Sequence, residues 1–255
     1  IVDGRIGFTG GVGISDDWMG NARGPGEWRD THYRLEGPAV AQMQAAFLDN
    51  WMETQNEVLD GADHFPKLDP VGDTKAQVFK ASPDEASESL RLMYLMALSA
   101  ARRSIRIMAS YFVPDRLTAA TLIAARRRGV SVEVIVPGRQ IDVRMVRWTS
   151  RSLWGPLLEA GVVIHEFQPS MYHCKVMVVD GLWVSVGSGN FDNRSFALND
   201  EANLNIYDAR IAALETAAFE ADRDRSRPIT LREWSSRPLP ERAVGWAGRL
   251  VKSQL

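Results

Sequence analysis

The middle of the chain alternates between short apolar runs and longer stretches in which apolar residues recur at helical spacing. Runs rich in β-branched residues are typical of buried strands, and helical spacing is typical of amphipathic helices. The predicted strands cover residues 76–81, 104–111, 130–136 and 162–167, and the predicted helices cover residues 84–102, 117–128 and 143–160. Such an alternation predicts an α/β fold in which helices flank a mixed sheet.

The pattern then changes to two apolar runs separated by a turn signal. Residues 173–179 and 182–186 are mostly apolar or β-branched, and Asp180 and Gly181 lie between them. An Asp-Gly pair between two such runs predicts a β-hairpin. The Gly-Ser-Gly-Asn segment at residues 187–190 follows the second strand, so we expect it to return beside the start of the hairpin.

The first strand of this hairpin holds the candidate chemistry. Side chains two residues apart on a strand share one face, so His173 and Lys175 are expected to point the same way. Cys174 is expected to point to the opposite side, as a small core residue. Asp180 lies roughly 16 Å further along the strand, which predicts a structural role in the turn. A His-x-Lys pair alone also fits a buried histidine in an ordinary hairpin, but the returning segment favours a phosphate site because its glycine amides and polar side chains can approach an anion.

The start of the chain repeats the second strand of the hairpin. Residues 1–14 match residues 178–191 at a constant offset of 177. The matched pairs are Asp3 with Asp180, Gly4 with Gly181, Gly10 with Gly187, Gly11 with Ser188 and Gly13 with Asn190. An internal duplication of this kind predicts a repeated architecture. In this register the histidine and lysine of the first copy fall four and two positions before residue 1, so we expect the chain to begin inside the first motif.

The duplication continues beyond the motif. A predicted strand and helix at residues 30–35 and 39–56 are repeated at residues 200–205 and 209–222, and Asp30 corresponds to Glu201. We therefore predict an α/β fold of two halves related by a pseudo-two-fold axis, each a mixed β-sheet flanked by helices. The expected parts are a first half at 1–56, a linker at 57–75, a second half at 76–230 and a C-terminal tail at 231–255.

Composition narrows the classes of protein. Of the 255 residues, 45% are hydrophobic, which is ample for a buried core. A formal net charge of −2 argues against a chain-wide basic surface for nucleic acid. The single cysteine excludes an internal disulfide and a multi-cysteine zinc site.

Two further segments each allow two interpretations. Residues 111–115, Tyr-Phe-Val-Pro-Asp, fit either the lining of a substrate channel or a structural turn from strand to helix. Residues 144–158 mix arginine with tryptophan, which fits an interfacial membrane helix, although packing against the sheet is favoured.

The motifs resemble those of a known family. HCKVMVVD followed by GSGN resembles the HxKxxxxD…GSxN signature of the phospholipase D superfamily. Within that superfamily the chain is most similar to bacterial cardiolipin synthases. That similarity extends over FTGGVGI, EWRDTHYRLEGPAV, YFVPD, HCKVMVVDG and GSGNFDNRSFALNDEANL, and so over nearly the whole chain.

The resemblance implies roles for individual residues. It implies a catalytic group of His173, Lys175 and Asp180, with phosphate contacts from Gly187, Ser188 and Asn190. It also implies that Glu201 orients His173, and that Asp30 orients the histidine of the first copy. The first-copy counterparts are Asp3, Gly10 and Gly11, whereas Gly13 stands where many members carry asparagine.

The implied reaction is phosphatidyl transfer between phospholipids by a two-step route through a phosphohistidine, without a metal or cofactor. The implied partners are a phospholipid such as phosphatidylglycerol and the surface of the bacterial cytoplasmic membrane, with peripheral attachment or an anchor outside this chain. Nucleic acid is not favoured.

Two alternatives remain open. One is a phospholipase D-like phosphodiesterase or nuclease, and the other is a non-catalytic module that binds phosphate or lipid. Because the implied route needs two histidines and this sequence has one His-x-Lys pair, we expect the 255-residue chain alone to be inactive or nearly so.

Overall fold

The computed structural model describes residues 1–82 and 89–250, and its centre is a mixed sheet of eight strands. The strands are β3 (Lys75–Ala81), β4 (Ser104–Ala109), β5 (Ser131–Pro137), β6 (Val163–Phe167), β7 (Lys175–Val179), β8 (Trp183–Gly187), β9 (Glu201–Tyr207) and β10 (Ser226–Ile229). Their order across the sheet is β10-β6-β5-β4-β7-β8-β9-β3, with β4, β5 and β6 parallel and the remaining pairs antiparallel.

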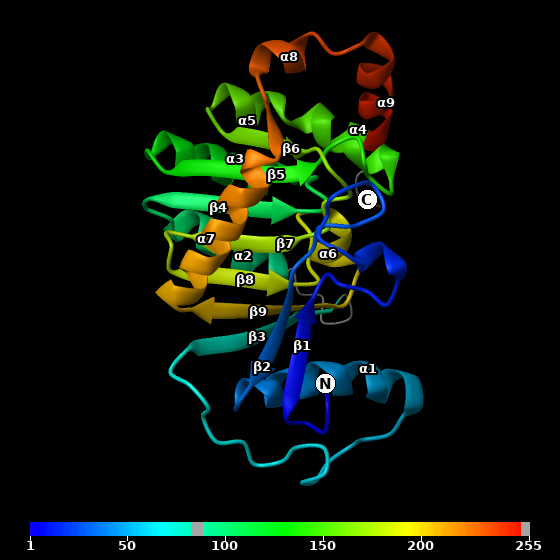
Figure 1. Cartoon of the computed structure of the whole chain (residues 1–255), viewed down its shortest axis with the longest axis vertical. Helices are drawn as coiled ribbons and strands as arrows, with labels where there is room; N and C mark the ends of the chain where they lie inside the picture. Colours follow the sequence, from blue (N-terminus) through cyan, green and yellow to red (C-terminus); the bar gives the residue numbers. More distant parts are fainter. Residues whose placement is uncertain (83–88, 251–255) are drawn as a thin grey trace.

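Helices cover both faces of this sheet (Figure 1). The helix α7 (Ala209–Asp224) crosses one face, and α2 (Ser89–Ala100) and α3 (Arg116–Arg127) lie on the other. Successive side chains of a strand point to opposite faces, so the sheet has a hydrophobic core on each face. Ile107 packs on the α2–α3 side, and the adjacent Met108 packs on the α7 side. The predicted helix 84–102 is confirmed from residue 89 onward, and its predicted start at 84–88 lies outside the described residues.

The predicted duplication is visible in the backbone. The strand β1 (Ile6–Gly10) lies at the same offset of 177 from β8, and the bridge between Val2 and Ile6 matches the pair Val179–Trp183. The two turns also match, because Asp3 and Asp180 have φ angles of 51° and 57°. Left-handed φ is tolerated by aspartate and glycine better than by other residues, which explains the repeated Asp-Gly pair.

The first half contributes a smaller unit than the second. Strand β1 pairs with β2 (His32–Glu36) in a two-stranded antiparallel sheet, and α1 (Ala39–Gln55) packs beside them. Gly10 faces His32 in this pair, as Gly187 faces Asn203 in the β8–β9 pair. Asp30 and Glu201 each lie two residues before these partners, so the predicted correspondence between the two acids is confirmed.

Three features differ from the sequence-based expectations. The single helix predicted at 143–160 is two, α4 (Arg144–Leu153) and α5 (Gly155–Glu159), because Pro156 lies in the first turn of α5 and lacks the N–H that would continue α4. The four-residue strand β10 was not predicted, and it contains Pro228, which is compatible with an edge strand. The tail forms α8 (Leu231–Ser235) and α9 (Leu239–Leu250).

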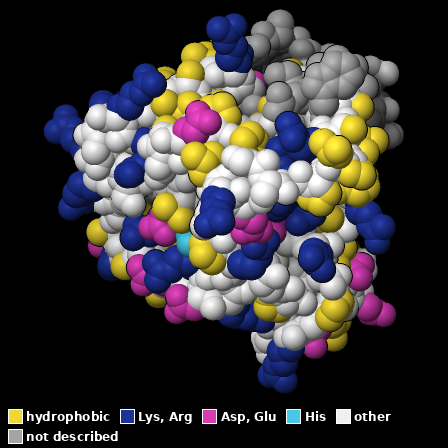
Figure 2. Space-filling view, turned by 90° about the horizontal axis from the view of Figure 1, so that it is seen from above, with side chains coloured by type: hydrophobic (Ala, Val, Ile, Leu, Met, Phe, Trp, Pro, Cys, Tyr) yellow, Lys and Arg dark blue, Asp and Glu magenta, His cyan; other side chains and the backbone are white. Residues whose placement is uncertain are grey.

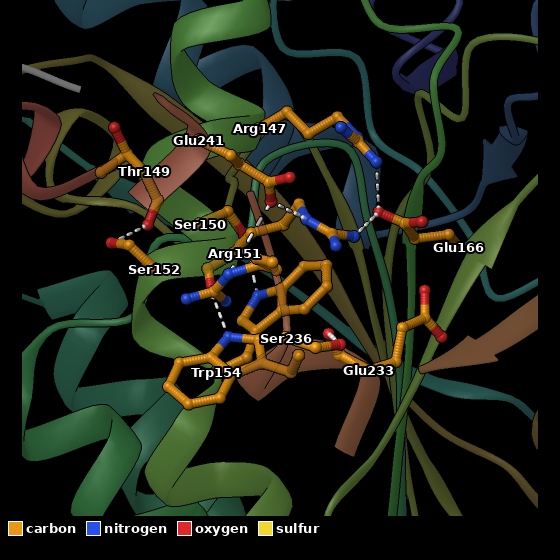
Figure 3. Close-up of polar contacts among 12 residues, drawn as sticks. Arg147, Thr149, Ser150, Arg151, Ser152, Trp154, Glu166, Glu233, Ser236 and Glu241 are labelled. Atoms are coloured by element: carbon orange, nitrogen blue, oxygen red, sulfur yellow. Dashed lines mark hydrogen bonds and ion pairs between the residues drawn. The ribbon is translucent and has the colours of Figure 1, made fainter. Parts of the chain in front are cut away.

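A buried carboxylate holds α4 and the tail against the sheet (Figure 3). Glu166, at 1% exposure on β6, accepts from Arg147 at 2.7 Å and from Arg151 at 2.5 Å. Arg227 reaches its other oxygen at 3.0 Å, and Arg151 also binds Glu241 of α9 at 2.6 Å. These contacts support packing against the sheet, the interpretation favoured for residues 144–158. Within residues 1–82 and 89–250, no helix has both the length and the hydropathy to cross a membrane.

The carboxylate of Asp180 fastens the far end of the hairpin to the neighbouring strand. It accepts from the backbone N–H groups of Arg102, Arg103 and Ser104, at 2.9, 2.7 and 2.9 Å. Burial, which raises the pKa of this carboxyl, is outweighed by these donors, so its pKa is lowered from the ordinary value. The structural role predicted for Asp180 is confirmed.

We predict that Asp180→Ala destabilises the fold. The change removes a charged acceptor from three backbone donors and places alanine at left-handed φ, which together cost about 2–4 kcal/mol. Urea denaturation measures the loss. Asp180→Asn keeps an acceptor and tolerates this φ, so its free energy of unfolding should fall clearly less. Equal losses of the free energy of unfolding in the two variants would contradict the structural role of Asp180.

We predict a larger effect for Glu166→Gln. This change removes the buried carboxylate charge that Arg147, Arg151 and Arg227 share, although Arg151 keeps its contact with Glu241, and the loss costs about 3–5 kcal/mol. The matched control is Asp73→Asn, which removes an exposed ion pair with Arg210 and should change the free energy of unfolding by about 0–1 kcal/mol. Similar losses of the free energy of unfolding in the two variants would show that Glu166 does not hold α4 and the tail against the sheet.

Candidate active site

The candidate site lies where β7 begins, at the edge of the sheet at which β4, β5 and β8 end. His173 and Lys175 lie on one side, with Lys175 Nζ 3.2 Å from His173 Nε2, and Cys174 is fully buried in the core cluster on the other side. The predicted orientation of these three side chains is confirmed. The imidazole is 19% exposed, so it can be reached from solvent.

The acid that contacts His173 is Asp30, and the expectation that Glu201 plays this part is wrong. Asp30 Oδ2 lies 2.8 Å from His173 Nδ1, whereas Glu201 Oε1 accepts from Asn199 at 3.3 Å. Glu201 begins β9, two strands from β7, which places the backbones about 10 Å apart. The segment before β2 instead forms a parallel bridge, Arg29 with Tyr172, which brings Asp30 across from the first half.

This pairing fixes the state of the imidazole. A carboxylate only accepts hydrogen bonds, so Nδ1 of His173 carries the proton that it donates to Asp30. Nε2 is then the nitrogen left for chemistry in the neutral ring. The Asp30–His173 pair therefore joins the two halves of the repeat in one site.

Two indoles enclose the pair, and sequence reasoning missed both. Trp18 Nε1 donates to Asp30 Oδ2 at 2.9 Å, so this oxygen accepts from both the indole and the imidazole. The ring centres of Trp18 and Trp28 lie 5.6 and 5.3 Å from that of His173. Their position near Asp30 in the sequence was the only available signal.

Lys175 connects the histidine to the returning segment. Its Nζ donates to Ser110 Oγ at 3.1 Å, and Ser110 Oγ donates to Asn190 Oδ1 at 2.5 Å. Asn190 thus lies in the site as predicted, while Ser110, at the end of β4, was missed. Burial lowers the pKa of Lys175, and the nearby carboxylates of Asp30 and Glu201 oppose that shift.

The glycines that were predicted to contact phosphate are also needed for close packing of the backbone. A side chain at Gly187 would collide with the carbonyl oxygen of Ala202, and one at Gly10 with that of Thr31, so both permit close strand pairing. A side chain at Gly11 would collide with the carboxylate of Asp30. Gly11 therefore leaves the space in which Asp30 reaches His173, and phosphate contacts by these glycines stay a prediction.

Ser188 and Glu201 face a separate cavity. Ser188 Oγ accepts from the backbone of Ala202 at 3.0 Å, and both Ser188 and Glu201 line a hollow of about 310 Å³ together with Phe8 and Lys80. Asp3 and Asp180 occupy the equivalent turns and are not part of either site.

Residues 111–115 form a structural turn. Phe112 and Val113 are buried, and Asp115 caps α3 by accepting from the backbone of Thr118 at 2.7 Å. Among the described residues, no cluster of three or more histidine, cysteine, aspartate or glutamate side chains could hold a metal ion.

Sequence comparisons identify a family and relatives of this chain. Residues 94–223 match the family model described as cardiolipin synthase, PLD-like domain. Cardiolipin synthase 2 of Staphylococcus epidermidis is 36% identical over 94% of this chain and 49% of its own length. The major cardiolipin synthase ClsA of Bacillus subtilis is 36% identical over 98% of this chain and 52% of its own length. The chain thus spans about half the length of the curated relatives it matches.

Two solved structures align with the fold of this chain. Nuc from Salmonella typhimurium, a phospholipase D family member, is 25% identical with a TM-score of 0.53, over 62% of this chain and 99% of its own. A phosphatidylserine synthase from Haemophilus influenzae aligns over 100% of this chain and 69% of its own, at 15% identity and a TM-score of 0.74. The motifs, the fold and the extent of these matches show that the chain belongs to the cardiolipin synthase family of phospholipase D-like proteins.

Proposed function

We propose that this chain supplies half of the active site of a phosphatidyltransferase of the cardiolipin synthase type. The main support for this proposal is that side chains at the start of β7 form one connected group. Asp30 fixes His173, and Lys175, Ser110 and Asn190 continue from the imidazole as a chain of polar contacts. A nucleophilic or proton-transferring histidine beside a cation suits attack on a phosphodiester.

The proposed reaction has two displacements. In the first, the nitrogen of one histidine forms a bond to phosphorus as the bond from phosphorus to the leaving alkoxide breaks, and a second histidine protonates that alkoxide. In the second, the hydroxyl of another lipid gives its proton to the second histidine and attacks phosphorus, and the phosphorus–nitrogen bond breaks. His173 serves as one of the two histidines.

Lys175 and its neighbours are placed to stabilise charge on the phosphoryl oxygens. Lys175 is only 8% exposed, and a cation in such a site acts more strongly on a growing negative charge than one in water. Asn190 can donate from its amide, because its oxygen is occupied by the hydroxyl of Ser110.

Glu201 fits the equivalent role toward the second histidine. It corresponds to Asp30 in the repeat, and it lines the cavity beside Ser188. We infer that a strand equivalent to β7 presents the second histidine to Glu201, as β7 presents His173 to Asp30. This exchange of acids between the halves would make each half dependent on the other.

The proposed substrates are phospholipids, with phosphatidylglycerol as donor and acceptor, taken from the surface of a bacterial membrane. The support is the family relationship to curated cardiolipin synthases. Figure 2 shows one face of the molecule, on which Lys and Arg side chains are interspersed with acidic and apolar ones. That distribution on this face, and the net charge of −2, do not favour a polynucleotide.

We predict that the full-length protein converts labelled phosphatidylglycerol in mixed vesicles to cardiolipin, and that His173→Gln lowers the rate by at least about 1,000-fold, since a covalent step loses its nucleophile or its proton donor. Thin-layer chromatography measures the product. Hydrolysis to phosphatidic acid without transfer would indicate a phosphodiesterase, and cleavage of a polynucleotide that weakens with salt would indicate a nuclease. Lipid binding without turnover would indicate a non-catalytic module.

The lowered pKa of Lys175 predicts a pH dependence. The ammonium form is the one that stabilises phosphoryl charge, so activity should fall as pH rises, and it should do so below the ordinary lysine pKa of about 10.5. In Lys175→Arg the charge persists, so its residual activity should not show this alkaline decline. A decline of the same midpoint in both proteins would assign it to another group.

A further inference from the structure

A buried aspartate on α7 holds the two chain segments that form the candidate site. Asp222 is 4% exposed and lies in the last turns of α7. Its Oδ1 accepts from Arg29 Nε at 2.9 Å, and its Oδ2 accepts from the hydroxyl of Tyr172 at 3.0 Å. Both oxygens of this carboxylate are thus engaged by side chains from different halves of the repeat.

The two donors immediately precede the two residues of the candidate pair. Arg29 comes before Asp30, and Tyr172 comes before His173, so one carboxylate fixes the neighbours of both. Asp30 and His173 are 143 residues apart in the sequence. Their proximity therefore depends on how these two segments are held together.

The backbones of the segments are also joined. The N–H of Arg29 donates to the carbonyl of Met171 at 2.8 Å, and the N–H of His173 donates to the carbonyl of Arg29 at 2.7 Å. The guanidinium of Arg29 bonds the carbonyl of Asp30 as well. Asp222 is placed to set the distance at which these short contacts form, because it binds a side chain on each segment.

The protonation of Tyr172 suits this arrangement. Burial, together with the nearby thiol of Cys174 and the charge of Asp222, raises the pKa of the phenol well above its ordinary value of 10. The hydroxyl therefore stays protonated and donates to Asp222 throughout the neutral range.

We propose that Asp222 is a positioning residue for the Asp30–His173 pair. It touches neither the imidazole nor the proposed phosphodiester, and it acts by holding Arg29 and Tyr172 in register. The expected effect of Asp222 on turnover rests on the proposed function. Its effect on the Asp30–His173 contact does not. Displacing reacting groups by about 1 Å can lower a rate by up to about 100-fold, which sets the scale of the expected effect.

The test is Asp222→Asn in the full-length protein. The two donors bind different oxygens of the carboxylate, and in asparagine one of these oxygens is replaced by an NH₂ group that cannot accept, so one of the two donors loses its partner. We expect kcat to fall about 10- to 100-fold while KM for phosphatidylglycerol changes less than about threefold, because the lipid contacts are retained. A second readout is the Nδ1 proton resonance of His173 in protein labelled with ¹⁵N-histidine, which should weaken or broaden as the Asp30 hydrogen bond loosens.

Two further variants separate positioning from loss of fold. Glu166→Gln also breaks a buried ion-pair network, but at α4 and the tail, so the folded fraction should keep its kcat and its His173 resonance. Tyr172→Phe removes one of the two donors and should lower kcat less than Asp222→Asn. The double variant should add little to Asp222→Asn, since both changes remove the same contact.

The proposal is overturned if folded Asp222→Asn keeps kcat within about twofold and its His173 resonance unchanged, or if Glu166→Gln reproduces both effects. If the unmodified protein transfers no phosphatidyl groups, the proposed function fails, and the resonance of His173 in the same variants still decides whether Asp222 holds the pair.

Discussion

The contact on which the site depends is the hydrogen bond between Asp30 and His173. It joins a loop before β2 to the start of β7, so His173 of the second half takes its acid from the first half. Several local features serve this one contact. Gly11 leaves room for the carboxylate, the Arg29–Tyr172 bridge brings it across, and Trp18 shares its oxygen. His173 is therefore oriented only when the two halves are docked against each other.

The sheet supplies the rigid part of the arrangement. Lys175 begins β7, flanked by β4 and β8 near the centre of the sheet, so its ammonium group emerges at an edge formed by strand ends. The strands hold this largely buried ammonium group at a defined place, from which we propose that it acts on a phosphoryl group. The far end of the same strand is held by Asp180, which explains why the motif contains an aspartate that lies away from the histidine.

Much of this could be predicted from the sequence, and the remainder depends on tertiary contacts. Turn chemistry and strand alternation predicted the hairpin and the faces of His173 and Lys175, because those signals are local. The match of residues 1–14 to residues 178–191 at a constant offset predicted the duplication. The sequence alone did not indicate which half provides the acid for His173, since Asp30 and Glu201 occupy equivalent positions and only the docking of the halves distinguishes them. Trp18 and Ser110 were missed for the same reason: each meets the site across long sequence separations.

Asp30, and not Glu201, is the partner of His173. The most direct measurement is the ¹H–¹⁵N spectrum of the imidazole of His173 in Asp30→Ala and Glu201→Ala proteins, compared at one pH with the unmodified protein. We expect the hydrogen-bonded Nδ1 proton to be lost in Asp30→Ala and retained in Glu201→Ala. Loss in Glu201→Ala with retention in Asp30→Ala would contradict this pairing.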